Sequence, residues 1–138
     1  MASTTASART ESSFATGVLF VHSCPKALVP HVEWALAREI GRVVKLDWSP
    51  QPLLPHTMRT VADWRGLAGT AAAVASSLFG WQQLRFELTE DQSAAGSGGR
   101  WMHTPALGGA WDRELEPFRA AEVGDATIFE LPQRLSAG

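Results

Sequence analysis

The stretch TGVLFVH, residues 16–22, is a continuous apolar run with the length of a strand. A run of this kind is typical of a central strand that is covered on both faces of a sheet. Ser23, Cys24 and Pro25 then supply a capping side chain and a proline for a helix start. Apolar residues follow at spacings of three and four, and Gly41 is expected to end the helix as a left-handed cap; they are Val29, Val32, Leu36 and Ile40. The chain is therefore expected to begin with a buried strand and an amphipathic helix.

Further segments predict four strands and a second helix. Residues 42–48 and 83–89 alternate between apolar and polar side chains, which is the pattern of a strand with one buried face. Residues 57–63 and 100–104 are the other predicted strands, and residues 71–79, rich in alanine and serine, predict a helix. Residues 49–55 contain three prolines, which cannot donate backbone hydrogen bonds, so we expect an extended loop there.

The order of these elements predicts an α+β fold of the ferredoxin-like, split βαβ type, with a β-α-β-β-α-β succession and an extra strand. In this arrangement, two helices cover one face of an antiparallel sheet, and the other face stays partly open. The helix-covered face is expected to carry Val44, Leu46, Leu84, Phe86 and Leu88, and the open face Lys45, Asp47, Arg59, Arg85 and Glu87.

A single domain is expected, because 138 residues lie in the usual size range of one domain. Residues 1–13 are small and polar, which predicts a flexible tail. Residues 14–107 are expected to form the α+β domain. Residues 108–138 form a weakly patterned, irregular extension, in which residues 114–123 predict a helix and residues 127–131 a short strand.

The composition excludes several classes of protein. A net charge of −2 supplies no basic field for nucleic acid, and no apolar run approaches the roughly 20 residues of a membrane-spanning helix. Cys24 is the only cysteine, so an internal disulfide is impossible and a reducing compartment fits best. We therefore expect a soluble, cytoplasmic protein without a nucleic-acid or membrane partner.

Cys24 and His22 are candidate catalytic residues. They lie where the first strand meets the first helix, and a helix N-terminus and an adjacent imidazole can lower the pKa of a thiol. The favoured alternative is a buried, structural thiol, because free cysteines are among the most buried residues. The four histidines lack the close spacing of metal ligands, so we expect no metal and no cofactor; they are His22, His31, His56 and His103.

Aromatic and arginine side chains form the candidate binding residues, which are Trp34, Trp48, Arg59, Asp63, Trp64 and Arg65. Trp48 shares the apolar face of its predicted strand, which favours a core position. Trp34 lies away from the apolar stripe of the first helix, so it is either a side anchor of the core or part of a partner surface. The others, near the proline loop, could hold a small anion or an acidic peptide. The favoured alternative is that the arginines pair with neighbouring aspartates on a solvated rim.

Several motifs resemble a family of uncharacterised proteins of high-GC Gram-positive bacteria, the actinobacteria, catalogued as a domain of unknown function. They are HSCPKALVPHVEWAL, the following DW and proline-rich loop, DWRGLAGTAAAVASSLFGWQQLRFELTED and RWMHTP. The resemblance covers roughly residues 14–107, and the chain departs from the family pattern from Gly108 onward. It implies no established activity. It also associates the chain with gene neighbourhoods of fatty-acid synthesis, which implies an accessory role beside carrier-protein or acyl-chain enzymes.

These features together predict a non-enzymatic binding or accessory domain that takes a protein partner or a small ligand. The alternative is a small thiol-dependent enzyme or redox sensor that uses Cys24 and His22. The oligomeric state stays open.

Overall fold

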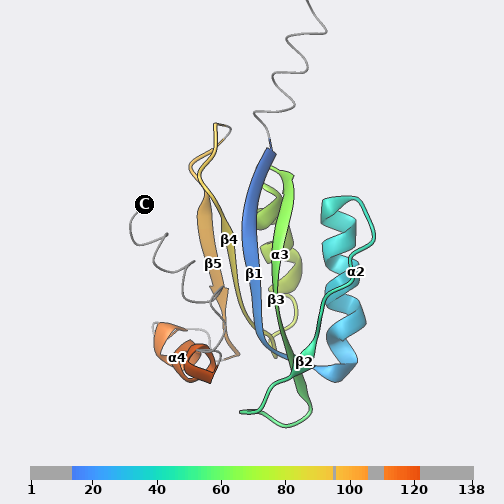
Figure 1. The fold of residues 1–138 in the computed structure, drawn as a ribbon, viewed down its shortest axis with the longest axis vertical. Coiled ribbons are helices and arrows are strands. Elements are labelled where there is room, and N and C mark those ends of the chain that lie inside the picture. Colours follow the sequence, from blue (N-terminus) through green and yellow to red (C-terminus); the bar gives the residue numbers. More distant parts are fainter. Residues whose placement is uncertain (1–13, 95, 106–110, 122–138) are drawn as a thin grey trace, which may run out of the picture.

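The computed structural model describes residues 14–94, 96–105 and 111–121, which form a mixed α+β fold (Figure 1). A five-stranded antiparallel sheet has the order β2-β3-β1-β4-β5, so the apolar strand β1 is central. Its strands are β1 (Phe14–Pro25), β2 (Ser49–Pro50), β3 (Thr57–Leu67), β4 (Arg85–Glu90) and β5 (Gly99–His103). The helices are α2 (Val29–Ile40), α3 (Thr70–Leu78) and α4 (Trp111–Ala121), with a short 3-10 helix at Lys26–Leu28.

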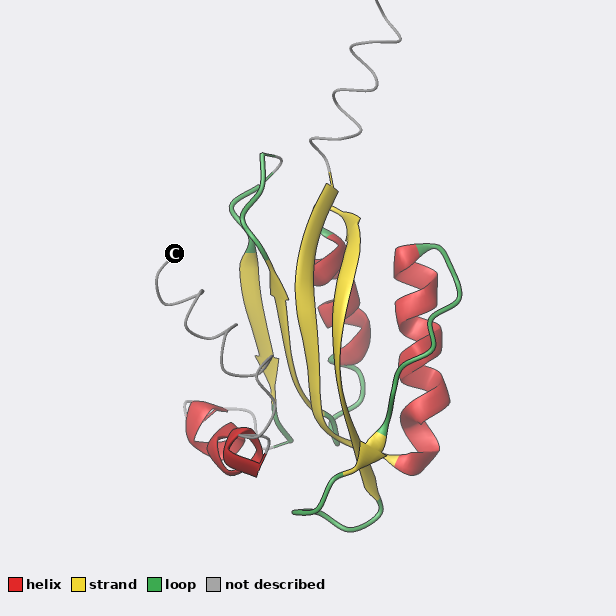
Figure 2. Ribbon diagram, in the orientation of Figure 1, coloured by secondary structure: helices red, strands yellow, loops and turns green. Residues whose placement is uncertain are grey.

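The two faces of the sheet are covered by different helices (Figure 2). Helices α2 and α3 pack on the face that carries the main core, which includes Leu19, Val21, Val32, Leu36, Val74, Leu78, Phe86 and Leu88. On the other face, Val18 and Phe20 of β1 pack with Val61 of β3. Helix α4 lies on this second face, where the ring of Phe118 approaches that of His22. The second face is therefore partly covered by α4, a helix that the sequence pattern did not assign to this face.

The start of α2 lies later than the sequence indicated, because Ser23, Cys24 and Pro25 belong to β1 and no side chain caps the helix. Strand β1 continues as far as Pro25, and the chain passes through the 3-10 helix before α2 begins at Val29. Pro30 occupies one of the first two helical positions, where its missing N–H costs no helical hydrogen bond. The predicted left-handed cap at Gly41 is confirmed, with a φ of 87°.

The predicted strand at residues 42–48 is wrong. This segment is extended but does not join the sheet, and only Ser49–Pro50, expected to be loop, pairs with β3. Its backbone has a different partner, because Oε2 of Glu33 in α2 accepts a hydrogen bond from the Leu46 backbone N–H at 2.8 Å. The apolar alternation still decides which side chains are buried, because those of Val44 and Leu46 pack against the core.

The remaining predicted elements lie close to their expected positions. The predicted strands at residues 57–63, 83–89 and 100–104 correspond to β3, β4 and β5, and the predicted helix at residues 71–79 corresponds to α3. Helix α4 begins at Trp111, earlier than the predicted residue 114. The expected tail at residues 1–13 and strand at residues 127–131 lie outside the described residues. Within the described part of the chain, none of the helices is both long and apolar enough to span a membrane.

Candidate functional site

A pocket of about 430 Å³ lies between β3, the two core-side helices and the segment at residues 42–46. It lies between β3 and this segment, whose Leu46 backbone N–H donates to Glu33 of α2. Its walls are mostly apolar, from Leu19, Leu36, Ile40, Val44, Leu46, Ala62, Ala71, Val74 and Leu88. The pocket therefore lies beside the outer edge of β3, where β2 pairs only with Met58 and Arg59.

Trp64 forms one wall of this pocket and is held in place by a close approach of three strands. Its indole N–H donates to the backbone oxygen of Thr89 on β4, at 2.8 Å, across the central strand β1. The indole passes over Gly17 of β1, where an added Cβ would lie 2.6 Å from the indole nitrogen and 1.9 Å from the Thr89 oxygen. Glycine is therefore required at position 17 for the ring to reach its partner.

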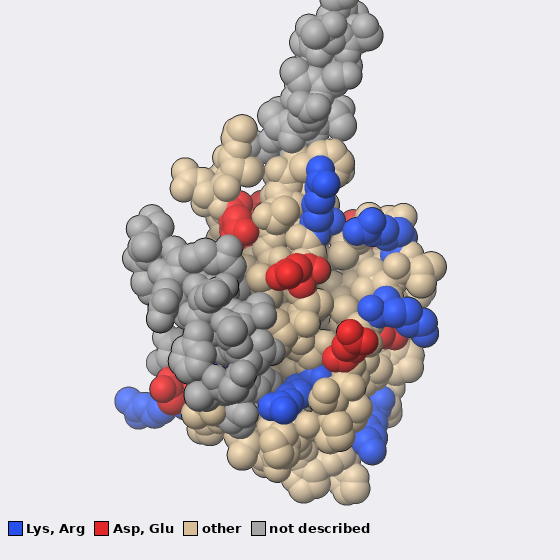
Figure 3. All heavy atoms as spheres, in the orientation of Figure 1, with Lys and Arg blue, Asp and Glu red and all other residues tan. Residues whose placement is uncertain are grey.

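The edge of the pocket is positively charged. Arg42, Lys45 and Arg65 are among its lining residues together with Asp63, so three cations and one carboxylate lie at its rim. Asp63 and Arg65 share the face of β3 that carries Val61, away from α2 and α3. Among the residues that the structure describes, none of these three cations forms an ion pair. The Arg65 guanidinium lies 4.9 Å from the centroid of the Phe14 ring. Figure 3 shows basic side chains interspersed with fewer acidic ones over β3 and the connection after α2.

The six predicted binding residues do not form one site. Asp63, Trp64 and Arg65 line the pocket, but Trp34, Trp48 and Arg59 do not. Trp48 packs against the core, and its indole N–H donates to Glu33 at 3.2 Å, in agreement with the favoured interpretation. Arg59 is half-buried on β3, where it pairs in register with Ser49 of β2.

Trp34 lies on the exposed side of α2. Its side chain is 63% exposed, and the Arg38 guanidinium lies 5.5 Å from the centre of its ring. Of the two interpretations, the structure favours surface exposure over a side anchor of the core.

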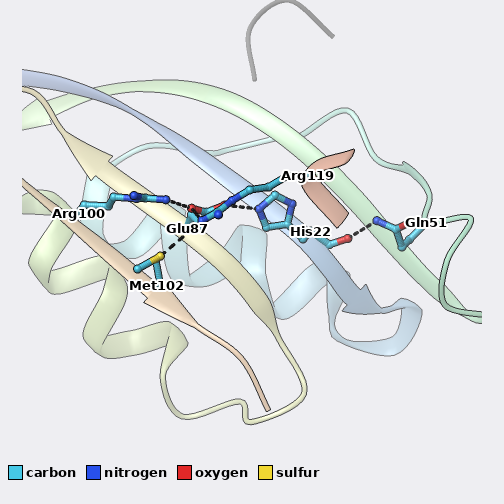
Figure 4. Close-up of polar contacts among 6 residues, drawn as sticks. All are labelled: His22, Gln51, Glu87, Arg100, Met102 and Arg119. Carbon is cyan, nitrogen blue, oxygen red and sulfur yellow. Dashed lines mark hydrogen bonds and ion pairs between the residues drawn. The ribbon is translucent and has the colours of Figure 1, made fainter. Parts of the chain in front are cut away.

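A buried charge cluster lies on the other face of the sheet, beneath α4 (Figure 4). Its centre is Glu87 of β4, whose Oε2 accepts hydrogen bonds from His22 Nε2 at 2.5 Å and Arg119 Nε at 3.0 Å. Its Oε1 accepts from Arg119 Nη2 at 2.6 Å and from Arg100. The backbone oxygen of His22 also accepts from the Gln51 side chain, at 2.7 Å. The cluster thus joins β1, β4, β5, α4 and the proline loop.

The environment of Glu87 keeps its carboxylate charged. Burial by itself raises the pKa of Glu87, but hydrogen bonds from His22 and Arg119, the charge of His22 and the hydrogen bond from Arg100 outweigh it. The net result is a pKa well below the ordinary range of a glutamate. Because both oxygens already accept two hydrogen bonds and the residue does not line the pocket, the cluster serves to hold elements together.

The structure does not bring Cys24 and His22 together as a reactive pair. Cys24 belongs to the core on the α2 and α3 side, whereas His22 contacts Glu87 and stacks on Phe20 on the other side. The thiol is fully buried and donates to the backbone oxygen of Pro25 at 3.3 Å. Burial raises the pKa of Cys24 to about 12, which opposes a thiolate.

The sequence analysis did not identify several residues of the pocket and of the charge cluster. Nothing in the sequence distinguishes Glu33, because a glutamate on an amphipathic helix is usually solvated. Arg42 and Lys45 were assigned to a strand rather than to a pocket edge. Glu87 was expected on an open face, and nothing in the local pattern of β4 indicates that Arg119, far along the chain, pairs with it. Within the described residues, His, Cys, Asp and Glu form no group of three or more that could hold a metal.

The fold and this site define a class of mixed α+β protein with an apolar pocket that has cations at its rim. The chain belongs to the family described as "Protein of unknown function (DUF3145)", whose model matches residues 18–109. No curated protein and no solved structure matches the chain. The matched range contains the whole pocket and Glu87, and α4 with Arg119 lies beyond it.

Proposed function

We propose that the chain is a non-enzymatic binding domain, and that the pocket beside β3 holds the apolar part of a ligand or partner that carries an acidic group. The observation that carries this proposal is the pairing of apolar walls with three cations, Arg42, Lys45 and Arg65, that form no ion pair within the described residues. The apolar walls favour burial of carbon groups, and the cations favour an anion at the edge.

The size and composition of the pocket support binding of a small group. A volume of about 430 Å³ falls within the range of roughly 300–1,000 Å³ that is usual for ligand pockets. Such pockets combine apolar residues with polar groups that fix orientation, and both kinds line the pocket here.

The test uses anilinonaphthalene sulfonate, which combines an apolar ring system with an anion and fluoresces when it is bound. We expect saturable binding to the full chain that weakens when Arg42 and Lys45 are both changed to Gln. Ala62→Phe should abolish it, because Ala62 lines the pocket and shares the core side of the sheet with its register partner Leu19. Ala72→Phe, on the exposed side of α3, is the matched control. Equal binding by all these variants would refute the proposal.

Three finer points belong to the same proposal. The ferredoxin-like assignment is supported by the strand order β2-β3-β1-β4, with β5 as the extra strand, and by α2 and α3 on one face.

The exposed side chain of Trp34 is proposed as a contact for a protein partner, since aromatic residues are enriched at interface hot spots. A cytoplasmic location, an actinobacterial origin and an accessory role in fatty-acid synthesis are proposed from the family resemblance and the single cysteine alone.

The contacts of Cys24 and His22 do not support the alternative, a thiol-dependent enzyme or redox sensor. It requires a reactive Cys24, yet burial raises the pKa of this thiol, and His22 is engaged with Glu87. Native labelling of the thiol separates this alternative from the binding domain.

A further inference from the structure

The outer edge of β3 is a sheet edge without a strand beside it over most of its length. Strand β3 has 11 residues and pairs with β1 from end to end. On its other side, β2 covers only Met58 and Arg59. Within the described residues, no strand lies beside residues 61–67 on that side.

This open edge is regular and unprotected by a bulge. The register with β1 runs without a shift from Phe14↔Leu67 to Val21↔Thr60, and the irregularity begins only after Val21. Edge strands are commonly blunted by bulges, prolines or a covering segment, because free backbone groups otherwise pair with another chain. Residues 61–67 contain no proline and no bulge.

The segment that could have covered this edge stands away from it. Residues 42–46 line the far side of the pocket, whereas Ala62, Asp63, Trp64 and Arg65 line the near side. The next strand of a sheet lies about 4.8 Å away, so a strand added to β3 would occupy the pocket itself.

We propose that residues 61–67 of β3 bind an extended, antiparallel peptide of a partner protein, which adds a strand to the sheet. This inference rests on the proposed function of the pocket and names its occupant. The antiparallel direction matches every other pair of strands in the sheet and is the more stable pairing. Backbone hydrogen bonds supply affinity in such additions, and alternate side chains supply specificity.

The side chains of β3 determine which peptide sequence would be complementary to this edge. Val61, Asp63, Arg65 and Leu67 alternate on the face away from α2 and α3, as do their register partners Val18 and Phe20. Leu67 is 58% exposed, so the end of this row offers apolar contact. Because opposite charges directly across a pair attract and like charges repel, the peptide should carry an acid opposite Arg65 and a base opposite Asp63. Its other side chains point toward α2 and α3 and should be apolar, because Leu36, Ala71 and Val74 line that side of the pocket.

The probe is an acetylated, amidated peptide as long as residues 61–67, with valine at all positions except a glutamate opposite Arg65 and a lysine opposite Asp63. The control peptide has the same composition with the glutamate and lysine exchanged. We expect the control to bind the full chain about tenfold more weakly in fluorescence anisotropy, because both charge pairs become repulsive. The double variant Asp63→Arg and Arg65→Asp should reverse this preference.

A second pair of peptides tests the backbone. N-methylation at every odd or every even position removes half of the N–H donors without changing the side chains. In a strand pairing, only alternate N–H groups point at β3, so one methylated peptide should lose binding and the other should keep it. Equal binding by both methylated peptides, or by both charge arrangements, would overturn the strand addition.

The outcomes separate this inference from the proposed function. If anilinonaphthalene sulfonate binds the pocket and the peptide does not bind, the pocket function stands and the added strand is wrong. If neither binds, both fall. If sedimentation of the unliganded chain reveals a dimer that Arg65→Asp dissociates, the occupant is a second copy of the chain, and the partner peptide is wrong.

Discussion

Replacing Glu87 with Gln should destabilise the protein strongly. The substitution keeps the shape of the side chain but removes the charge that His22, Arg100 and Arg119 surround. His22 is fully buried, so the change leaves cations facing a neutral amide away from water. Removing one partner of a buried ion pair typically costs about 3–5 kcal/mol. We expect a loss in the lower half of this range, because Arg100 and Arg119 are only partly buried and can reach solvent.

The assay is thermal and urea unfolding of the full chain beside Glu116→Gln, an exposed glutamate of α4. A loss of 1 kcal/mol lowers Tm by roughly 4 °C for a domain of this size, so a loss of about 3 kcal/mol predicts a Tm about 12 °C lower. Glu116→Gln should change the free energy of unfolding by less than about 0.5 kcal/mol. A loss below about 1 kcal/mol for Glu87→Gln would refute the reasoning.

The pH dependence supplies an independent check of the same cluster. The pKa of Glu87 is lower in the folded protein than the ordinary value of about 4.3. The unfolded chain therefore binds this proton at a higher pH than the folded chain does, and stability falls as pH falls below about 4.3. In Glu87→Gln this contribution is absent, so its stability should decline less steeply in acid than that of the wild type. Parallel acid limbs for the two proteins would contradict this assignment.

Three further predictions concern the walls of the pocket and the core. Gly17→Ala should destabilise the fold by about 1–3 kcal/mol in urea unfolding, since its Cβ would lie 1.9 Å from the Thr89 oxygen; an unchanged midpoint would contradict the close approach. Glu33→Ala should speed hydrogen exchange at the Leu46 amide, which loses its acceptor, and unchanged exchange would mean that Glu33 does not hold this segment. Native Cys24 should resist iodoacetamide at pH 8 and react after denaturation, because burial raises the pKa of Cys24 to about 12; rapid native labelling would support the thiol-dependent alternative.

The central part of the fold could be predicted because its signals are local. The apolar run at residues 16–22 requires cover on both faces, and β1 is indeed the middle strand. Gly41 ends α2 through its own backbone preference, with no help from distant residues. Features of this kind depend on neighbours in sequence and are readable from it.

The error at residues 42–48 has a physical cause. Alternation reports which side chains are buried, and here Val44 and Leu46 are packed against the core as expected. It does not report which group accepts the backbone hydrogen bonds, and the carboxylate of Glu33 accepts the one from Leu46. The pocket is lined by residues of β1, β3, β4, α2, α3 and this segment, so no local motif could have indicated it.

The buried position of Glu87 was also beyond the reach of local patterns. A glutamate that alternates with Phe86 and Leu88 normally points to solvent. Here Arg119 of α4 and His22 of β1 converge on it from separate parts of the chain. Long-range pairing of this kind needs the tertiary structure to be seen.

The most direct test of the pocket is a nuclear magnetic resonance titration of the full, isotope-labelled chain with anilinonaphthalene sulfonate. We expect the largest shifts at the Trp64 indole N–H and at the amides of Ala62 and Leu46, which lie around the pocket. Shifts centred on His22 and Glu87, with Trp64 unchanged, would contradict it and would move the binding site to the opposite face of the sheet.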